Sequence, residues 1–489
     1  MMLWLLVLIV SRLITVNFNP AFLDSREYIE LAKSPWRVAI TSGHPPIHPG
    51  YITLIKSAGA QAGLVSALAG IGTIIIFYKL IKELWDQKTA KIAAIILALV
   101  PGVWIVQENV MVEAVSLWWL TLATYLATRR RWLGVGISLT IMLLTHNQML
   151  VWIPLMFGFT KVKQKAVMGA VVVAALVYAL LGQNLVSLVY SKTGEIVPWW
   201  SLGIDLLRYG RNAVILWLRL HSNLIGLVAI GAIIRQRKLW VLLPYLFWAQ
   251  FYSADFLIRR LVPVALVSSV AIAVAVKNKW VLSGLMLVLA ISSIPVVWSY
   301  SWLNRDQIIN KIHRLQAQIP EDALYIDSHF LRTINNFPGE MYHLGESTNR
   351  LTPVQAIKVA LQQGKRVFID SQAMTDPYQF YVGNQLHPLS LGKFGKSEAK
   401  EIFKQFYIKN MLVTDAEKRI FAYELTNEPT EMGQNIPGEA VLVYGPSRLI
   451  KQRLDYFDPL SWLWAVVTDK REPVVWVYAD AGGKYVLPK

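Results

Sequence analysis

Asp24-Ser25-Arg26-Glu27-Tyr28 and His44-Pro45-Pro46-Ile47-His48-Pro49-Gly50-Tyr51 lie about twenty residues apart, between the first two apolar runs of the sequence. The first stretch predicts a helix of about ten residues, because Asp24 followed three positions later by Glu27 resembles a capping box. The apolar stripe of that helix would be Tyr28, Leu31 and Ala32. In the second stretch, three prolines force an extended turn ahead of another helix.

Long apolar runs surround these two stretches and place the chain among membrane proteins. Of its 489 residues, 55% are hydrophobic and only 16% are charged, which is too apolar for a soluble enzyme of this size. Runs that could cross a core of about 30 Å lie at about 2 to 17, 57 to 80, 89 to 107, 110 to 128, 166 to 190, 213 to 234, 259 to 276 and 280 to 300, with a shorter one at 239 to 254.

Basic residues are concentrated between these runs and predict the orientation. Residues 1 to 304 contain 26 Lys and Arg against 10 Asp and Glu, whereas residues 305 to 489 contain 22 against 21. This placement favours cytoplasmic loops of a membrane domain over a nucleic-acid surface. Both flanks of Trp132 to Thr160 are basic, so this region should return as a hairpin of two short helices, 132 to 145 and 149 to 160, with a polar tip at 145 to 148. The prediction is eleven transmembrane helices with a cytoplasmic amino terminus.

Acidic residues of the membrane half gather on the opposite side. Only Glu83 and Asp86 are cytoplasmic in this topology. The other eight acids lie at exterior ends, and they are Asp24, Glu27, Glu30, Glu108, Glu113, Glu195, Asp205 and Asp255. A functional site on the extracytoplasmic face would account for this segregation, which the positive-inside rule does not require.

From about Asn304 the composition becomes that of a soluble domain. Short strands are expected at 323 to 327, 366 to 370 and 411 to 413, with helices at 352 to 363 and 397 to 406. Alternating helices and strands predict an α/β domain with some parallel pairing. We therefore expect a transmembrane domain over 1–303, with a first exterior loop over 17–56, and an extracytoplasmic α/β domain over 304–489. No Gly-rich phosphate loop follows these strands, and we assign no catalytic residue there.

Several polar residues in the membrane half are candidates for chemistry. Glu113, near the start of the fourth span, should face the bundle because exposure to lipid is costly; a structural hydrogen bond is the alternative. Glu108 is expected in the preceding turn. His44 and His48 flank the prolines and suit hydrogen bonding to a phosphate or sugar, since their spacing is a weak metal signal. Cationic groups that could bind phosphate, or alternatively reach lipid headgroups, are Arg219, Arg259 and Arg260.

These motifs, in this order, resemble the GT-C superfamily of polytopic glycosyltransferases. Residues 24–32 look like the first-loop acidic motif of the protein O-mannosyltransferases and aminoarabinose transferases. The His44-Pro45-Pro46 turn is similar to their His/Lys-Pro-Pro turn, and Glu113 falls where a bacterial mannosyltransferase-like group has Glu. Phe256 to Pro263 resembles the Arg-Tyr-Leu-Leu-Pro segment that opens a late span. His146 stands where many relatives have Lys.

The resemblance implies transfer of a sugar, such as the hexose mannose, from a polyprenyl-phosphate carrier to an acceptor hydroxyl on a sugar, lipid or protein. Asp24 would act as general base of an inverting reaction, with Glu113 as the second catalytic carboxylate. The donor phosphate would meet Arg260, Arg259, Arg219 and His146. Substrate contacts would come from His44, Glu27, Tyr28, His48 and Glu108. A divalent cation, Mg or Mn, is left open, with Asp24 and Glu113 as its ligands if one is bound.

Two other classes of function remain open from the sequence. A transporter or flippase of lipid-linked substrates would use the buried charges to line a path, although the chain shows no internal repeat and no matched pair of broken spans. A receptor or assembly protein would leave Asp24 and Glu113 facing away from a common site. Nucleic acid is not an expected partner, whereas membrane lipids are.

Overall fold

The chain consists of two compact units in a computed structural model, one helical and one built around β-sheets. The structure describes residues 2–18, 23–35, 48–146, 149, 152–153, 164–180, 223–236, 262–300, 308–328, 337–344, 349–370, 396–413, 421–431, 440–442, 476–479 and 485–486. The principal division between the units falls between Leu303 and Asn304.

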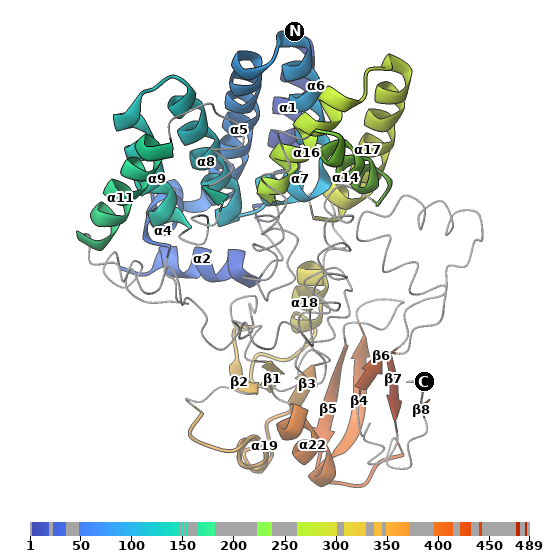
Figure 1. The fold of residues 1–489 in the computed structure, drawn as a ribbon. Coiled ribbons are helices and arrows are strands. Elements are labelled where there is room, and N and C mark those ends of the chain that lie inside the picture. The colour runs from blue at the N-terminus through green and yellow to red at the C-terminus, as the bar shows by residue number, and fades with distance from the viewer. Residues whose placement is uncertain are drawn as a thin grey trace, which may run out of the picture. The chain divides into compact units, whose positions relative to one another are not determined.

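The helical unit is arranged around one long helix, α5. Helices α4, α6, α7 and α8 all pack against it, and α9 packs against α8 (Figure 1). The described helices are α1 (Met2–Thr15), α2 (Leu23–Lys33), α4 (Pro49–Ala58), α5 (Ala62–Leu84), α6 (Gln87–Leu99), α7 (Pro101–Glu108), α8 (Val112–Thr128), α9 (Trp132–Thr145), α11 (Gln164–Leu180), α14 (Asn223–Arg235), α16 (Val262–Ala275) and α17 (Lys279–Tyr300).

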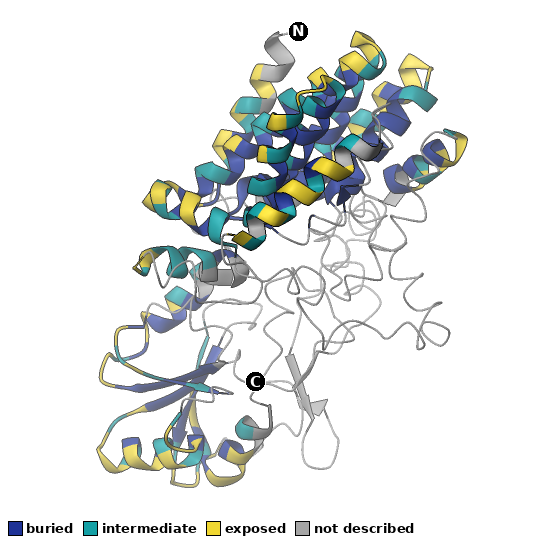
Figure 2. Cartoon of the chain, turned by 60° about the vertical axis from the view of Figure 1, so that its left-hand side comes forward, coloured by how far each residue is buried: buried dark blue, intermediate teal, exposed yellow. Residues whose placement is uncertain are grey.

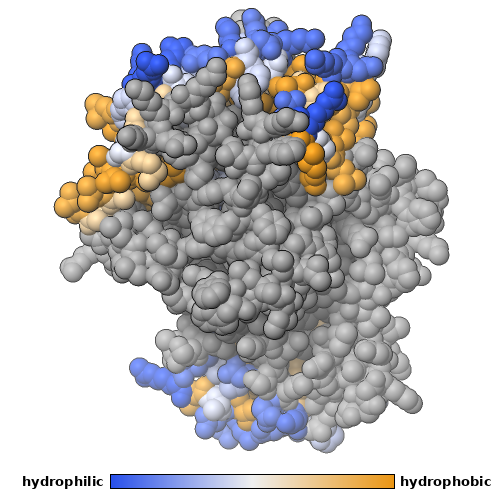
Figure 3. All heavy atoms as spheres, in the orientation of Figure 1, coloured by the Kyte–Doolittle hydropathy of each residue, from blue (hydrophilic) through white to orange (hydrophobic). Residues whose placement is uncertain are grey.

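The surface of the helical unit is apolar on its flanks. Buried residues lie where helices face one another, and many outward faces carry exposed Leu, Ile and Val (Figure 2). Among the exposed large apolar side chains of the described residues, only Leu351 and Val359 lie outside this unit. Figure 3 shows the apolar flanks below a hydrophilic end. Such broad exposed apolar surface is typical of a protein that is solvated by lipid.

One continuous helical run in the described residues, Pro49–Leu84, is long and apolar enough to cross a membrane. A second is present if the bent pair α6 and α7 forms one span, and five apolar helical segments are shorter. The predicted count of eleven spans therefore stays a prediction, as do the cytoplasmic amino terminus and the extracytoplasmic location of the second unit.

One local prediction was wrong, and another segment has a geometry that the sequence analysis did not address. The run at 89 to 107 is present as α6 and α7, which meet at an angle of 65°. Pro101 begins α7, and proline lacks the N–H and the space that a continuing helix needs. Asp24 does not precede its helix as a cap, since α2 begins at Leu23 and Asp24 lies in the first turn.

The first arm of the expected hairpin is present as α9, and its polar end is covered by protein. Thr145 is the last residue of the helix, and both Thr145 and His146 are buried. Residues 154–163, which would complete the second arm, lie outside the described residues. The site below depends on this end of α9.

The second unit contains a five-stranded sheet of order β2-β1-β3-β5-β4. Strand β1 pairs in parallel with β2 and β3, while β5 pairs antiparallel with β3 and β4. The described elements are α18 (Ile308–Gln316), β1 (Leu324–Ser328), β2 (Glu340–Leu344), α19 (Pro353–Gln362), β3 (Val367–Asp370), α22 (Lys396–Gln405), β4 (Tyr407–Val413), β5 (Phe421–Thr426) and a separate small sheet of β6 (Ala440–Leu442), β7 (Trp476–Ala479) and β8 (Tyr485–Val486).

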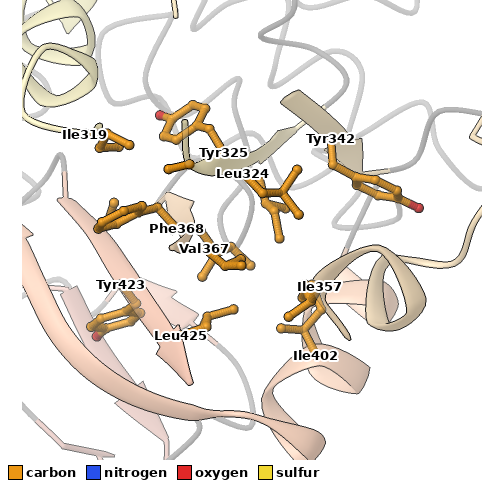
Figure 4. Close-up of a cluster of buried hydrophobic side chains, with 14 of the residues drawn as sticks. Ile319, Leu324, Tyr325, Tyr342, Ile357, Val367, Phe368, Ile402, Tyr423 and Leu425 are labelled. Atoms are coloured by element: carbon orange, nitrogen blue, oxygen red, sulfur yellow. The ribbon is translucent and has the colours of Figure 1, made fainter. Parts of the chain in front are cut away.

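The core of this unit follows the two-residue period of its strands. Val367 and Leu425 lie on the face toward Ile357 and Ile402 of α19 and α22, while Phe368 lies on the other face (Figure 4). On that second face, Arg366 donates two hydrogen bonds, of 2.8 and 2.7 Å, to the Glu424 carboxylate. This pairing lowers the pKa of Glu424 below its ordinary value.

Candidate active site

Two histidines meet where α4 begins and α9 ends. His48 precedes Pro49, the first residue of α4, and proline is favoured there because that N–H has no helical partner. Gly50 lets this turn lie close to α9, because a Cβ at Gly50 would be only 3.1 Å from the carbonyl carbon of Leu144. His146 directly follows α9. The two imidazole rings lie with centroids 5.1 Å apart and their planes at 74°.

Tyr28 of α2 completes a cluster of four rings with these histidines. Its ring centroid is 5.8 Å from that of His48 and 5.2 Å from that of Tyr51, both in edge-to-face arrangements. Beyond Tyr28, the side chains of Ile29, Leu31 and Ala32 pack against buried residues of α4, α5 and α8. The apolar stripe of α2 therefore faces protein, and its packing keeps Tyr28 in contact with His48.

Glu113 is related to this cluster by its electrostatic interaction with Tyr51. It lies in the first turn of α8 with only 2% of its surface exposed, and its charge acts on the fully buried Tyr51 phenol. The Ser66 hydroxyl of α5 accepts the Met111 N–H at 3.1 Å and donates to the Met111 carbonyl at 3.2 Å. The Ser66 hydroxyl also lies 3.4 Å from the Tyr51 phenol oxygen, within hydrogen-bond distance. Ser66 thus secures the start of α8, where the N-cap residue has no side-chain cap.

A separate buried polar cluster joins α1 to the bend between α6 and α7. Arg12 is fully buried, lies 4.0 Å over the Trp104 ring and donates its Nε–H to Gln107 Oε1 at 2.7 Å. Another of its N–H groups bonds to the Ala98 carbonyl, and Ser293 of α17 donates to the next carbonyl, that of Leu99, at 2.5 Å. These donors bond to carbonyls in the last turn of α6, beside the bend, where the final carbonyls of a helix lack helical donors.

Glu108 belongs to this second cluster and not to the ring cluster. It is the last residue of α7 rather than part of a turn, and it is fully buried. Thr15 and Arg12 lie near its carboxylate, yet neither oxygen has a hydrogen bond of good geometry among the described residues. Thr15 has no proton left for it, since its hydroxyl donates to the Ser11 carbonyl.

The structure brings together three residues that sequence analysis singled out, namely Tyr28, His48 and His146, while Glu113 is buried within electrostatic range of their neighbour Tyr51. Asp24 and Glu27 lie on α2, but their side chains are outside what the structure describes. Also outside the described residues are His44, Arg219, Arg259 and Arg260. Within the described part of the chain, no group of three His, Asp or Glu residues could hold a metal ion, and a cation at Asp24 and Glu113 stays a prediction.

Tyr51, Ser66 and Arg12 are contributors that the sequence reasoning missed. Arg12 could have been noticed, because a lone arginine inside an apolar span is costly without a partner. Tyr51 stands in the Pro49-Gly50-Tyr51 run of the quoted motif, but sequence analysis assigned it no role, and Ser66 carries no comparable signal. Only packing shows that they meet.

Residues 44–182 match a protein-family model described as dolichyl-phosphate-mannose-protein mannosyltransferase. The resemblance to the GT-C glycosyltransferases is confirmed. The matching segment includes Glu113 and three members of the ring cluster, His48, Tyr51 and His146, but it begins after Asp24 and Tyr28. No curated protein gives a significant match to the sequence.

Solved GT-C structures are similar to this chain at low sequence identity. ArnT from Cupriavidus metallidurans bound to undecaprenyl phosphate is 11% identical, with a TM-score of 0.44 over 88% of this chain and 97% of that one. The Archaeoglobus fulgidus oligosaccharyltransferase in complex with zinc and sulfate is 17% identical, with a TM-score of 0.47 over 79% and 70%. The archaeal oligosaccharyltransferase AglB from the same organism, in complex with an inhibitory peptide and a dolichol-phosphate, is 14% identical, with a TM-score of 0.45 over 87% and 74%.

Proposed function

We propose that this chain is an inverting glycosyltransferase that moves a sugar, a hexose such as mannose, from a polyprenyl-phosphate carrier to an acceptor hydroxyl at the extracytoplasmic face of the cell membrane. One observation carries the proposal. The segment that matches the mannosyltransferase model contributes His48 and His146, whose rings are in contact, and His48 also contacts Tyr28 from the first loop. The acceptor hydroxyl belongs to a sugar, a lipid or a protein, because the reaction requires only a hydroxyl group.

The transfer requires the protein to accept a proton from the acceptor and to stabilise the charge on the departing phosphate. As the acceptor oxygen attacks the anomeric carbon, its proton passes to the carboxylate of Asp24, which serves as the general base. The bond between the anomeric carbon and the phosphate oxygen breaks on the opposite face, so the configuration inverts. The polyprenyl phosphate leaves with the bonding electron pair, and Arg260, Arg259, Arg219 and His146 stabilise its charge.

The ring cluster supplies positioning in this proposal. His48 and His146 present N–H groups that can bond to phosphate or sugar oxygens. Glu113, with Tyr51 beside it, and His44 orient the sugar or the acceptor through hydroxyl groups. The remaining substrate contacts are assigned to Glu27, Tyr28 and Glu108. A positioned donor and acceptor react faster because the entropy of bringing them together has already been lost on binding.

A transfer assay in vesicles tests the proposal and separates it from transport. The full chain is reconstituted with a polyprenyl-phosphate hexose labelled in the sugar, and membrane extract from the source cells supplies acceptors. We expect free polyprenyl phosphate and the label on a covalent product to appear together. Movement of intact labelled lipid across the bilayer, without any covalent product, would instead establish a transporter.

Gly50 provides a test of the close approach between α4 and α9. A methyl group at Gly50 would meet the backbone of Leu144, which cannot rotate away, so Gly50→Ala should separate His48 from His146 and lower transfer about 10-fold. Gly136→Ala on α9 is the matched control, because the added Cβ meets no atom within 4 Å. Initial rates of both variants decide the point, and equal rates would show that the histidine pair tolerates displacement.

A further inference from the structure

The carboxyl end of α2 is held by a lysine from a different helix. Lys56 of α4 donates through Nζ to the carbonyl of Ala32 at 2.7 Å and to that of Ser34 at 2.5 Å. Ala32 lies in the last turn of α2, and Ser34 directly follows the helix. A single ammonium group therefore binds two carbonyls at the point where α2 ends, across more than twenty residues of sequence.

This contact suits the chemistry of a helix end. The final carbonyls of a helix lack helical donors and carry the negative end of its dipole, so a cation bound there is stabilising. The hydrogen bonds are charge-assisted, and Lys56 is half-buried, which limits screening by solvent. Lys33 of α2 differs in both respects, because its ammonium is largely exposed and pairs only with Glu30 one turn earlier.

Helix α2 carries the residues on which the transfer chemistry is placed. Tyr28 contacts His48 and Tyr51, and Asp24 stands four residues, about one turn, before Tyr28 on the same helix. Lys56 and Tyr51 are both on α4, so one helix contacts α2 in the middle through Tyr51 and at the end through Lys56. Two contacts along its length restrict rotation and sliding of α2 against α4 more than the ring contact could alone.

We propose that Lys56 is a positioning residue of the transferase, whose ammonium fixes the end of α2 and thereby the placement of Tyr28 and Asp24. The inference rests on the proposed function. Lys56 touches neither the donor nor the acceptor, and it acts through the two carbonyls of α2. A displacement of about 1 Å at a reacting group can lower a rate about 100-fold while binding is retained.

Lys56→Met tests this role, with Lys33→Met as the matched control on α2. Hydrogen exchange of the α2 amides in the full chain should become about 10-fold faster in Lys56→Met and stay unchanged in Lys33→Met. In the transfer assay, kcat of Lys56→Met should fall about 10- to 100-fold with the KM for the polyprenyl-phosphate hexose nearly unchanged. Lys56→Arg retains charge and donors and should recover most of kcat. If Lys56→Met does not fold, Lys56→Gln, which keeps a donor without the charge, takes its place.

The two measurements distinguish failure of the positioning role of Lys56 from failure of the proposed function. Unchanged α2 exchange in Lys56→Met would overturn the inference whatever the activity. Faster exchange with an unchanged kcat would also overturn it, because α2 would then be loosened without consequence for transfer. If the wild-type chain transfers no sugar, the proposed function fails, the positioning role falls with it, and the exchange result still decides whether Lys56 holds α2.

Discussion

Asparagine in place of Asp24 should lower the turnover number of sugar transfer about 10²- to 10⁴-fold, the usual contribution of a general base. The amide has nearly the shape of the carboxylate, but it cannot accept the proton that the acceptor hydroxyl loses as it attacks. Binding of the donor should change little, because the base acts on the acceptor. Initial rates at saturating polyprenyl-phosphate hexose, with donor affinity measured separately, check both statements.

Glu30→Gln is the matched control for this substitution. Glu30 lies on the same helix, α2, and is partly exposed in a pair with Lys33, so its charge has little influence on stability. This variant should transfer sugar at the wild-type rate. Full activity in a folded Asp24→Asn protein would remove Asp24 from the mechanism and leave the base to be found elsewhere.

Methionine in place of Arg12 should lower the free energy of unfolding by about 3–5 kcal/mol, as loss of one member of a buried polar network does. The substitution leaves Gln107 Oε1 and the Ala98 carbonyl without their donor in a fully buried place. It also removes the cation above Trp104 and the positive group nearest to Glu108. The midpoint of denaturant-induced unfolding in detergent is the measurement.

A control variant and a double variant make the Arg12 result specific. Arg131→Met removes an exposed arginine at the turn before α9 and should change stability by less than about 0.5 kcal/mol. Adding Glu108→Gln to Arg12→Met should recover part of the lost free energy of unfolding, because the double variant no longer contains a buried carboxylate without a compensating charge. A wild-type midpoint for Arg12→Met alone would contradict the network.

Local signals in the sequence predicted many of the helices and strands. The apolar runs at 110 to 128 and 280 to 300 correspond closely to α8 and α17, because length and apolar composition are properties of a single segment. The helix expected at 352 to 363 is α19, whose N-cap Thr352 and Gln355 form a capping box. At 89 to 107 the apolar run is also helical, but it bends where Pro101 begins α7, and the apolar pattern alone does not indicate that bend.

The sequence indicated which residues are candidates for the site, but it did not indicate which of them lie together in space. Buried charge in an apolar segment is costly wherever it lies, so Glu108 and Glu113 both attracted notice. The structure assigns them to different clusters, Glu108 beside Arg12 at the bend and Glu113 beside Tyr51. Which charge meets which partner depends on helix crossings, and periodicity along one chain segment carries no information about those.

By itself, the sequence determined the long apolar segments before residue 304, the change to an α/β pattern after it, and the acids and histidines between the first two apolar runs. Those properties follow from composition and short-range pattern. Only the tertiary structure decided that Tyr28, His48 and His146 share one place, that α2 faces protein, and that Lys56 holds its end. The reason is physical. These contacts join residues distant in sequence, and local pattern does not determine which helices meet; between α4 and α9, for example, the missing side chain at Gly50 allows a close approach.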